Sequence, residues 1–209
     1  NMLGVDISSK MIDKANKELK NSGYQDLVFT CGDMKDLSFK ADVVVSLGVS
    51  GYQYNQKEFL YQLSNLVVKN GILIFTTGNG DSITRFLRRK LSNIHSRING
   101  KIKRDGIKFQ TIKDSQVNSL LFENGFKLEK KLYLTFGLGL ASSYLELSLN
   151  RFLFKYFSKN FLSKYFSLTV IYLFREAKYK FKNQICLYQL EILVTLSIIF
   201  FYIFNFRIS

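Results

Sequence analysis

The stretch Met2-Leu3-Gly4-Val5-Asp6 decides the fold, because it is a short apolar run that ends in an acid. Ser8 or Ser9 can cap a helix directly after it, and apolar residues then recur at the spacing of one helical face (Met11, Ile12, Ala15 and Leu19). Residues 21–23 end this helix, and residues 27–31 are predicted to form a second strand. The chain is therefore expected to begin with a strand, a helix and a strand.

The same alternation continues along the chain. Residues 41–46 contain Val43-Val44-Val45, a β-branched run typical of a strand buried on both faces. The next helix is predicted to end at Lys69-Asn70-Gly71, and its apolar face comprises Phe59, Leu60, Leu63, Leu66 and Val67. Residues 72–77 are predicted to form another buried strand. Such alternation predicts βαβ units, a mostly parallel Rossmann-like sheet and an α/β fold.

Composition narrows the class of protein further. The chain has 209 residues, Lys+Arg 30 against Asp+Glu 16, a net charge of +14 and a hydrophobic content of 47%. This hydrophobic content supports a folded core and excludes a disordered chain. Cys31 and Cys186 are too few for a disulfide scaffold or a Cys-rich zinc site, and His95 is the only histidine. We therefore expect no metal centre, and we expect a reducing compartment.

Two acids stand where a sheet of this kind binds its ligand, beyond the carboxyl ends of the strands. Asp6 ends the first predicted strand, and Asp33 follows the second by two residues. An acid in such a place can accept hydrogen bonds from ribose hydroxyls. Each acid also has a plain structural explanation, because Asp6 can cap the next helix and Gly32-Asp33 is common turn chemistry.

Taken in order, several segments resemble the motifs of class I S-adenosylmethionine-dependent methyltransferases. Gly4-Val5-Asp6-Ile7-Ser8 is similar to the family's second-strand motif, and Cys31-Gly32-Asp33-Met34 is similar to its adenine-binding loop. Residues 42–49 resemble its fourth strand and active-site loop. The resemblance continues through residues 66–74, through residues 120–126 as the late helix and the start of the sixth strand, and through residues 169–174 as the last, antiparallel strand.

This resemblance implies a cofactor, S-adenosylmethionine, and a set of residues that bind it. Asp6, with Ile7 beside it, would bind the ribose hydroxyls. Asp33 would accept a hydrogen bond from the adenine amino group, and Met34 would supply a backbone contact and apolar cover. The methionine moiety and the substrate would be bordered by Ser46, Leu47 and Gly48.

One part of the family pattern is not found. The family's glycine-rich loop follows its first strand, upstream of the acid at the end of the second, and only five residues precede Asp6. We therefore expect the chain to lack that strand and loop, so that two neighbouring strands either pair with each other or expose edges. Gly78-Asn79-Gly80 is no substitute, because it follows the fifth strand of the pattern.

The general base of the reaction is not evident from the sequence. His95 has a suitable unperturbed pKa but lies among polar and basic residues, which also fits a surface histidine. Tyr52 and Tyr54, just after the active-site loop, are candidates for shaping a substrate pocket, and they also fit ordinary aromatic contacts.

The positive charge is concentrated in the second half of the chain. Residues 1–90 carry 12 Lys/Arg and 9 Asp/Glu, whereas residues 91–209 carry 18 and 7. We expect a methyltransferase-like domain over residues 1–177, with basic, substrate-side insert regions at 85–113 and 140–166. The first of these regions can meet nucleic-acid phosphates, an anionic bilayer, a phosphorylated substrate or only solvent. In the second, Arg151, Lys155 and Lys159 predict a basic amphipathic helix, suited either to a membrane interface or to packing over the substrate pocket.

Residues 178–209 form a hydrophobic tail. Residues 187–206 could reach about 30 Å as a helix, the thickness of a bilayer core, and they contain thirteen Leu, Ile, Val or Phe residues. Lys178, Lys180 and Lys182 precede them, so the positive-inside rule predicts a cytoplasmic domain with membrane association through this segment. The alternatives are a buried helix and a tail that arises from a frame shift or read-through.

The sequence as a whole predicts methyl transfer from S-adenosylmethionine to a small-molecule or lipid-like acceptor at an anionic membrane surface. One alternative is a non-catalytic, membrane-associated remnant of the fold. The other is an RNA methyltransferase that uses the basic region 85–113. Within this RNA methyltransferase alternative, enzymes that methylate adenine or cytosine amino groups are disfavoured. They generally carry a proline-rich tetrad at the position where this chain has Ser46-Leu47-Gly48-Val49.

Overall fold

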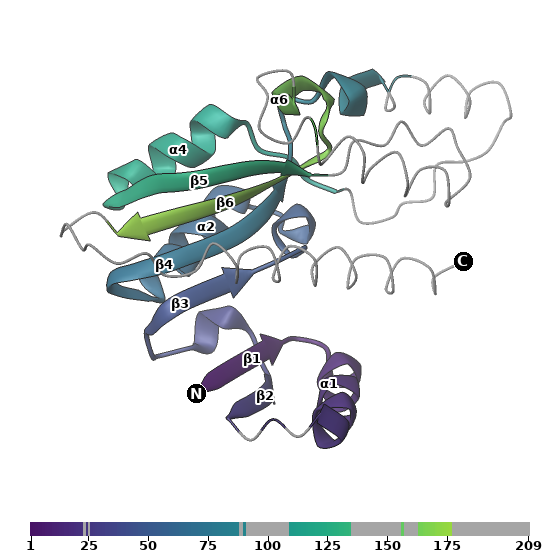
Figure 1. The fold of residues 1–209 in the computed structure, drawn as a ribbon, viewed down its shortest axis with the longest axis vertical. Coiled ribbons are helices and arrows are strands. Elements are labelled where there is room, and N and C mark those ends of the chain that lie inside the picture. The colour runs from purple at the N-terminus through teal and green to yellow at the C-terminus, as the bar shows by residue number, and fades with distance from the viewer. Residues whose placement is uncertain are drawn as a thin grey trace, which may run out of the picture. The chain divides into compact units, whose positions relative to one another are not determined.

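A computed structural model describes residues 1–22, 24, 26–87, 90, 109–134, 156 and 163–176. The chain divides into two compact units, Asn1–Lys40 and Ala41–Ser209, and each has its own sheet (Figure 1). Among the described residues, no helix combines the length and the apolar composition that crossing a bilayer requires.

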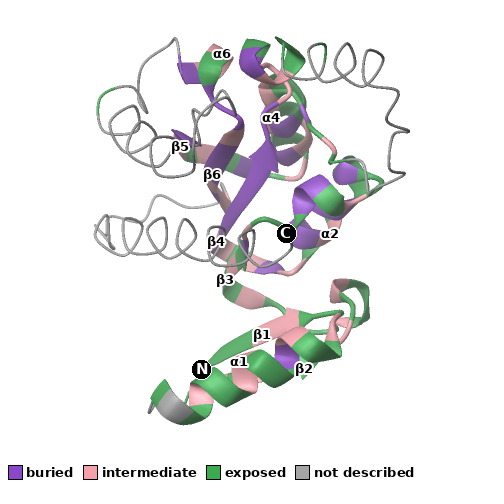
Figure 2. Ribbon diagram, turned by 90° about the vertical axis from the view of Figure 1, so that its right-hand side faces the viewer, coloured by how far each residue is buried: buried purple, intermediate pink, exposed green. Residues whose placement is uncertain are grey.

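The first unit is the predicted strand, helix and strand. Strand β1 (Met2–Asp6) and strand β2 (Leu27–Cys31) pair in parallel, with Met2 opposite Leu27 and Asp6 opposite Cys31. Helix α1 (Ser9–Ser22) connects them, and a short 3₁₀ helix, η1 (Met34–Asp36), follows β2. Within the described residues of this unit Ile12 alone is buried, as expected of a unit too small to enclose much core (Figure 2).

The second unit contains a four-stranded sheet in the order β3-β4-β6-β5. Strand β3 (Ala41–Ser46) is parallel to β4 (Val67–Gly78), and β6 (Thr169–Glu176) runs antiparallel between β4 and β5 (Phe126–Leu134). Figure 1 shows β6 between its two neighbours. The last strand, expected at residues 169–174 and antiparallel, is confirmed on both counts.

Helices α2 (Gln56–Asn65) and α4 (Asp114–Glu123) pack against each other and against this sheet, as Figure 2 shows. A short 3₁₀ helix, η2 (Ser50–Tyr52), precedes α2, and helix α6 (Ser163–Phe166) precedes β6. Helix α4 is followed by Gly125 at φ 84°, the left-handed conformation that glycine tolerates best, and β5 begins at the next residue.

The core of this unit is centred on β4 and β6. The rings of Phe75 and Tyr172 stack with centroids 5.3 Å apart, and Phe174 lies 6.1 Å from Phe75. A second cluster of buried aliphatic residues comprises Ile74, Leu132, Leu134 and Ile171. Both faces of the central strands are therefore apolar, as the continuous hydrophobic runs in the sequence predicted.

The predicted end of α2 was wrong. The helix ends at Asn65 instead of near residues 69–71, and Val67 already pairs with Ala41 in the sheet. The reason is tertiary, because the Leu66 carbonyl accepts a hydrogen bond from Ala41 N at 2.8 Å and the chain leaves the helix to join β3. Asn70 lies within β4 but adopts the left-handed conformation, at φ 68°, and its N–H donates to Glu176 Oε2 at 2.6 Å.

Several predictions fall outside the described residues. These concern His95, most of the basic regions 85–113 and 140–166, and the tail 178–209 with its candidate membrane segment 187–206.

In the described residues, β1 pairs only with β2, and β3 pairs only with β4. Within this part of the chain, β1 and β3 therefore each have one edge without a strand partner. The strand expected at residues 41–46 is confirmed, but its expected burial on both faces was wrong, because Val43 and Val45 are exposed.

Candidate active site

The first group of candidate residues lies at the carboxyl edge of the two-stranded sheet. Asp6 ends β1, and its Oδ1 accepts a hydrogen bond from Ser8 N at 2.8 Å, which holds the turn into α1. The Asp6 carbonyl accepts from Gly32 N at 3.0 Å, so the loop after β1 and the loop after β2 are joined. Ile7, the neighbouring candidate, is largely exposed.

Asp33 lies in the loop after β2, at the same edge as Asp6. It caps η1, and its Oδ1 accepts from Lys35 N at 3.1 Å. Met34 is half-buried beside it. Within the described part of the chain, the second carboxylate oxygen of Asp6 and that of Asp33 have no hydrogen-bond partner. These two oxygens are thus available to accept hydrogen bonds from a ligand.

The second group is the loop after β3. Ser46 is buried at the end of the strand, and Leu47 packs against the Ile74 cluster. Gly48 adopts φ 74°, and its N–H donates to Thr76 Oγ1 at 2.7 Å. Because residues other than glycine rarely adopt this backbone conformation, the loop requires glycine at this position.

Thr76 fixes this loop at two points. Besides accepting from Gly48, it accepts at its carbonyl from Ser50 Oγ at 2.8 Å. The Ser50 carbonyl in turn accepts from Gln56 Nε2 at 3.0 Å, which ties η2 to the start of α2. The loop after β3 is therefore held rigidly against the carboxyl end of β4.

An open cavity of about 320 Å³ lies beside this loop, at the start of α2. Tyr54 contributes to its lining and is 98% exposed, and Lys57, Gln110 and Gln116 line it as well. Tyr52 is not among the lining residues. It packs edge-on against Phe109, with ring centroids 5.5 Å apart, and so lies against the segment that carries Gln110.

That segment, residues 109–113, crosses the carboxyl end of β4. Gln110 N donates to the Gly51 carbonyl at 2.7 Å, and Ile112 N donates to the Gly78 carbonyl at 3.2 Å. Gly80 allows a close backbone approach, because a Cβ there would stand 2.8 Å from the Ile112 carbonyl oxygen. The Gly78-Asn79-Gly80 sequence therefore accommodates backbone packing.

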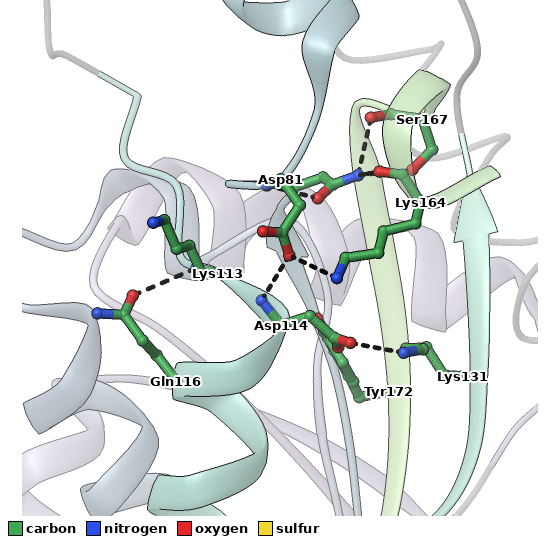
Figure 3. A network of polar contacts seen from close by, with 9 residues as sticks. Asp81, Lys113, Asp114, Gln116, Lys131, Lys164, Ser167 and Tyr172 are labelled. Atoms are coloured by element: carbon green, nitrogen blue, oxygen red, sulfur yellow. Dashed lines mark hydrogen bonds and ion pairs between the residues drawn. The ribbon is translucent and has the colours of Figure 1, made fainter. Parts of the chain in front are cut away.

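A polar network, shown in Figure 3, holds this region together. Asn79 Nδ2 donates to Ser167 Oγ at 2.9 Å and to the Lys164 carbonyl at 2.7 Å, so the loop after β4 is joined to α6. Asp81 Oδ2 accepts from Asp114 N at 3.0 Å, which fixes the first turn of α4.

Asp114 extends the network into the sheet. Its side chain accepts from Lys131 Nζ at 2.7 Å and from the Tyr172 hydroxyl at 3.0 Å. Burial, together with the Asp114 charge and hydrogen bond, raises the pKa of Tyr172 far above its usual value of 10.0. Burial alone would lower the pKa of Lys131, but hydrogen bonds and charge interactions with Asp114 and Tyr133 together outweigh it, and the net shift is upward.

Among the described residues, no three His, Cys, Asp or Glu side chains are grouped so that they could hold a metal ion. Within each unit, the candidate side chains are instead hydrogen-bonding groups of the kind that orient an organic ligand.

Sequence reasoning missed Thr76, Gln110, Asn79 and Asp114. Thr76 and Asn79 could have been predicted from the sequence. They are polar residues at or just after the carboxyl end of the apolar strand 72–77, where sheets of this kind bind ligands. Gln110 and Asp114 had none, since their positions depend on contacts with residues distant in sequence.

Comparison with known proteins agrees with this arrangement of strands. A model of a methyltransferase domain family matches residues 1–130, and the chain belongs to that family. The expected fold class, that of class I S-adenosylmethionine-dependent methyltransferases, is confirmed by the solved structures that resemble it. No curated protein matches the sequence.

Three solved structures illustrate the likeness. They are magnesium protoporphyrin IX methyltransferase from Synechocystis PCC 6803 with bound SAH (17% identity, TM-score 0.57), PKMT2 from Rickettsia typhi in complex with AdoHcy (15%, 0.58), and the YcgJ protein from Bacillus subtilis (12%, 0.54). The matches cover 84%, 88% and 85% of this chain, and 64%, 45% and 82% of those proteins. The chain thus spans less than two thirds of the first two, and identities this low concern the fold.

Proposed function

We propose that this protein transfers a methyl group from S-adenosylmethionine to a small-molecule or lipid-like acceptor at a membrane surface. The observation that carries the proposal is the pair Asp6 and Asp33 in a chain of the methyltransferase domain family. Each acid ends its strand or follows it closely at one sheet edge, and each retains a carboxylate oxygen with no partner among the described residues.

These two oxygens fit the proposed cofactor chemically. A carboxylate accepts hydrogen bonds from vicinal hydroxyls, which is the role proposed for Asp6 toward the ribose. Asp33 would accept from the adenine amino group, with Met34 supplying apolar cover and Ile7 lying beside the ribose. Because both side chains are already held by backbone N–H groups, they would bind with little loss of conformational entropy.

The second unit would supply the acceptor side. Ser46, Leu47 and Gly48 lead into the loop that Thr76 fixes, and the cavity lined by Tyr54 lies beside that loop. A volume of about 320 Å³ is at the lower end of the range for small-molecule sites. Its lining combines amide side chains with an aromatic ring and one lysine, which suits an acceptor with both polar and apolar parts.

When bound, S-adenosylmethionine supplies an electrophilic methyl group on a sulfonium centre. The residues of this chain would act by binding and positioning, because a methyl transfer depends mainly on holding the nucleophile in line. Rigid attachment of the loop after β3 to Thr76 serves this purpose. The proposed membrane location is supported by the apolar and basic segments of the sequence.

Calorimetric titration with S-adenosylmethionine tests the proposal directly. It should be carried out on the 209-residue chain and on the longest reading frame that contains it, with SAH as a competitor. Saturable binding that SAH displaces is expected. If neither protein binds the cofactor, the proposed function is wrong. Methyl transfer from labelled cofactor into separate lipid and water-soluble extracts then identifies the acceptor class.

A further inference from the structure

The short helix that follows the β4 loop presents an apolar face to solvent. Residues 83–87 are helical, and Ser82 begins the helix by accepting from Arg85 N at 3.2 Å. Ile83, Phe86 and Leu87 are 48%, 54% and 50% exposed. Because residues three and four apart share a side of a helix, these three form one apolar face.

The inward side of the same helix is polar. Thr84 is 3% exposed and Ser82 is 5% exposed, so the distribution is the reverse of that in an ordinary surface helix, which buries its apolar side. An exposed apolar face of this kind indicates a surface that is covered when the protein functions.

Positive charge accompanies this apolar face. Lys90 lies one turn further along, on the same side of the helix, and its Nζ stands 4.9 Å from the centroid of the Phe86 ring. The sequence from 85 to 113 holds ten basic residues and a single acid, Asp105. Aliphatic and aromatic side chains with a neighbouring lysine are the composition of segments that lie in the interface of an anionic bilayer.

The helix is also connected to the acceptor cavity. The Arg85 side chain extends to the opposite side of the helix, where its guanidinium lies 5.1 Å from the centroid of the Phe109 ring. Phe109 is the residue before Gln110, which lines the cavity, and its ring contacts Tyr52. A surface bound by the helix would therefore be next to the cavity.

We propose that the face formed by Ile83, Phe86 and Leu87 inserts into the interfacial layer of an anionic lipid bilayer, with Lys90 at the headgroups. Single-stranded nucleic acid is a poorer match for this face, because Ile83 and Leu87 offer no ring for base stacking. Docking of the helix rests on the proposed function only for its purpose, which is to bring the cavity to a lipid-like acceptor. The binding itself requires neither cofactor nor turnover.

The chain contains no tryptophan, so a single introduced tryptophan reports its own surroundings. Phe86→Trp in the full chain is mixed with vesicles of phosphatidylcholine and phosphatidylglycerol, with and without brominated lipid. The expected result is a blue-shifted emission that brominated lipid quenches. Phe122→Trp is the matched control, because Phe122 on α4 is 78% exposed and should stay in water. Equal quenching at both positions, or quenching at neither, overturns the proposal.

Co-sedimentation with the same vesicles gives a second measurement. A loss of binding on changing the helix residues cannot be attributed to the tail 187–206, because the tail is the same in every variant. The triple change Ile83→Ser, Phe86→Ser and Leu87→Ser should lower the partition coefficient at least about tenfold, and Lys90→Gln about fivefold. Circular dichroism and the urea midpoint check that the triple variant is folded, while Phe122→Ser should bind as the unchanged protein does. Undiminished binding of the folded triple variant overturns the proposal, as does equal binding of the unchanged protein to neutral vesicles. If binding of a competing single-stranded RNA requires the three residues and binding of the vesicles does not, the face binds nucleic acid instead.

Failure of the helix to bind lipid would leave the proposed methyl transfer untouched. Conversely, vesicle binding by a chain that does not bind S-adenosylmethionine would remove the proposed function and keep the docking surface.

Discussion

The hydroxyl of Tyr172 donates to Asp114 Oδ1 across 3.0 Å and so joins the last strand of the sheet to the first turn of α4, 58 residues earlier in the chain. Asp114 also accepts from Lys131 on β5. One carboxylate thus secures three elements below the segment that lines the cavity, and its partners are donors whose pKa values are raised by it.

This relationship predicts a loss of stability at alkaline pH. The unfolded chain releases the tyrosine proton near pH 10, whereas folded Tyr172 retains it, so above about pH 10 the unfolded state binds fewer protons than the folded state. The contribution of Tyr172 to the free energy of unfolding should therefore be fully present below about pH 10. Above that pH, the free energy of unfolding should fall by up to about 1.4 kcal/mol per pH unit because of this group.

Urea denaturation between pH 8 and pH 11 measures the effect. Tyr172→Phe should lower the free energy of unfolding by about 1–3 kcal/mol at pH 8, because Asp114 loses a donor, and should flatten the alkaline decline. Tyr61→Phe, at an exposed tyrosine of α2, serves as the control and should change neither quantity. An alkaline decline as steep in Tyr172→Phe as in the unchanged protein would show that another group causes it.

A second prediction concerns the close packing of residues 109–113 on the β4 loop. In Gly80→Ala the new Cβ would meet the backbone of Ile112 and Lys113 at 2.7–2.8 Å, and backbone cannot turn aside as a side-chain end can. We expect a loss of about 1–3 kcal/mol in the free energy of unfolding. Gly32→Ala is the matched control, since nothing lies within 4 Å of its Cβ position, and similar costs for both variants would contradict the packing argument.

A third prediction separates the two uses of the Asp6 carboxylate. Asp6→Asn keeps an oxygen that can accept from Ser8 N and removes the charge, so the fold should survive while affinity for S-adenosylmethionine falls about tenfold to a hundredfold. Asp13→Asn, which removes an exposed acid from α1 in the same unit, should leave the affinity unchanged. Calorimetry gives both values, and equal affinities of the two variants would exclude Asp6 from the cofactor site.

The parts of the fold that were predictable from the sequence are those coded by local pattern. Val43-Val44-Val45 and the run ending in Asp6 predicted their strands correctly, because β-branched and apolar runs favour extended backbone, although neither strand is buried on both faces. The end of α2 was not predictable, because it depends on the hydrogen bond from Ala41 N to the Leu66 carbonyl. No residue near Leu66 in the sequence indicates that pairing.

The candidate site divides in the same way. Asp6 and Asp33 were proposed from their places at strand ends, whereas the positions of Gln110 and Asp114 depend on contacts with Gly51 and Tyr172. A residue whose position depends on partners tens of residues away leaves no periodic trace in the sequence.

The position of β6 between β4 and β5 also determines the order in which the protein can be completed during synthesis. The ribosome makes β4 and β5 first, and both must wait for Thr169–Glu176 before either gains its antiparallel neighbour. At ordinary translation rates the delay after β4 is on the order of ten seconds. During that time β4, which carries Leu73, Ile74 and Phe75, lacks its neighbour β6. The nascent chain therefore exposes an apolar strand edge, which a chaperone would be expected to shield.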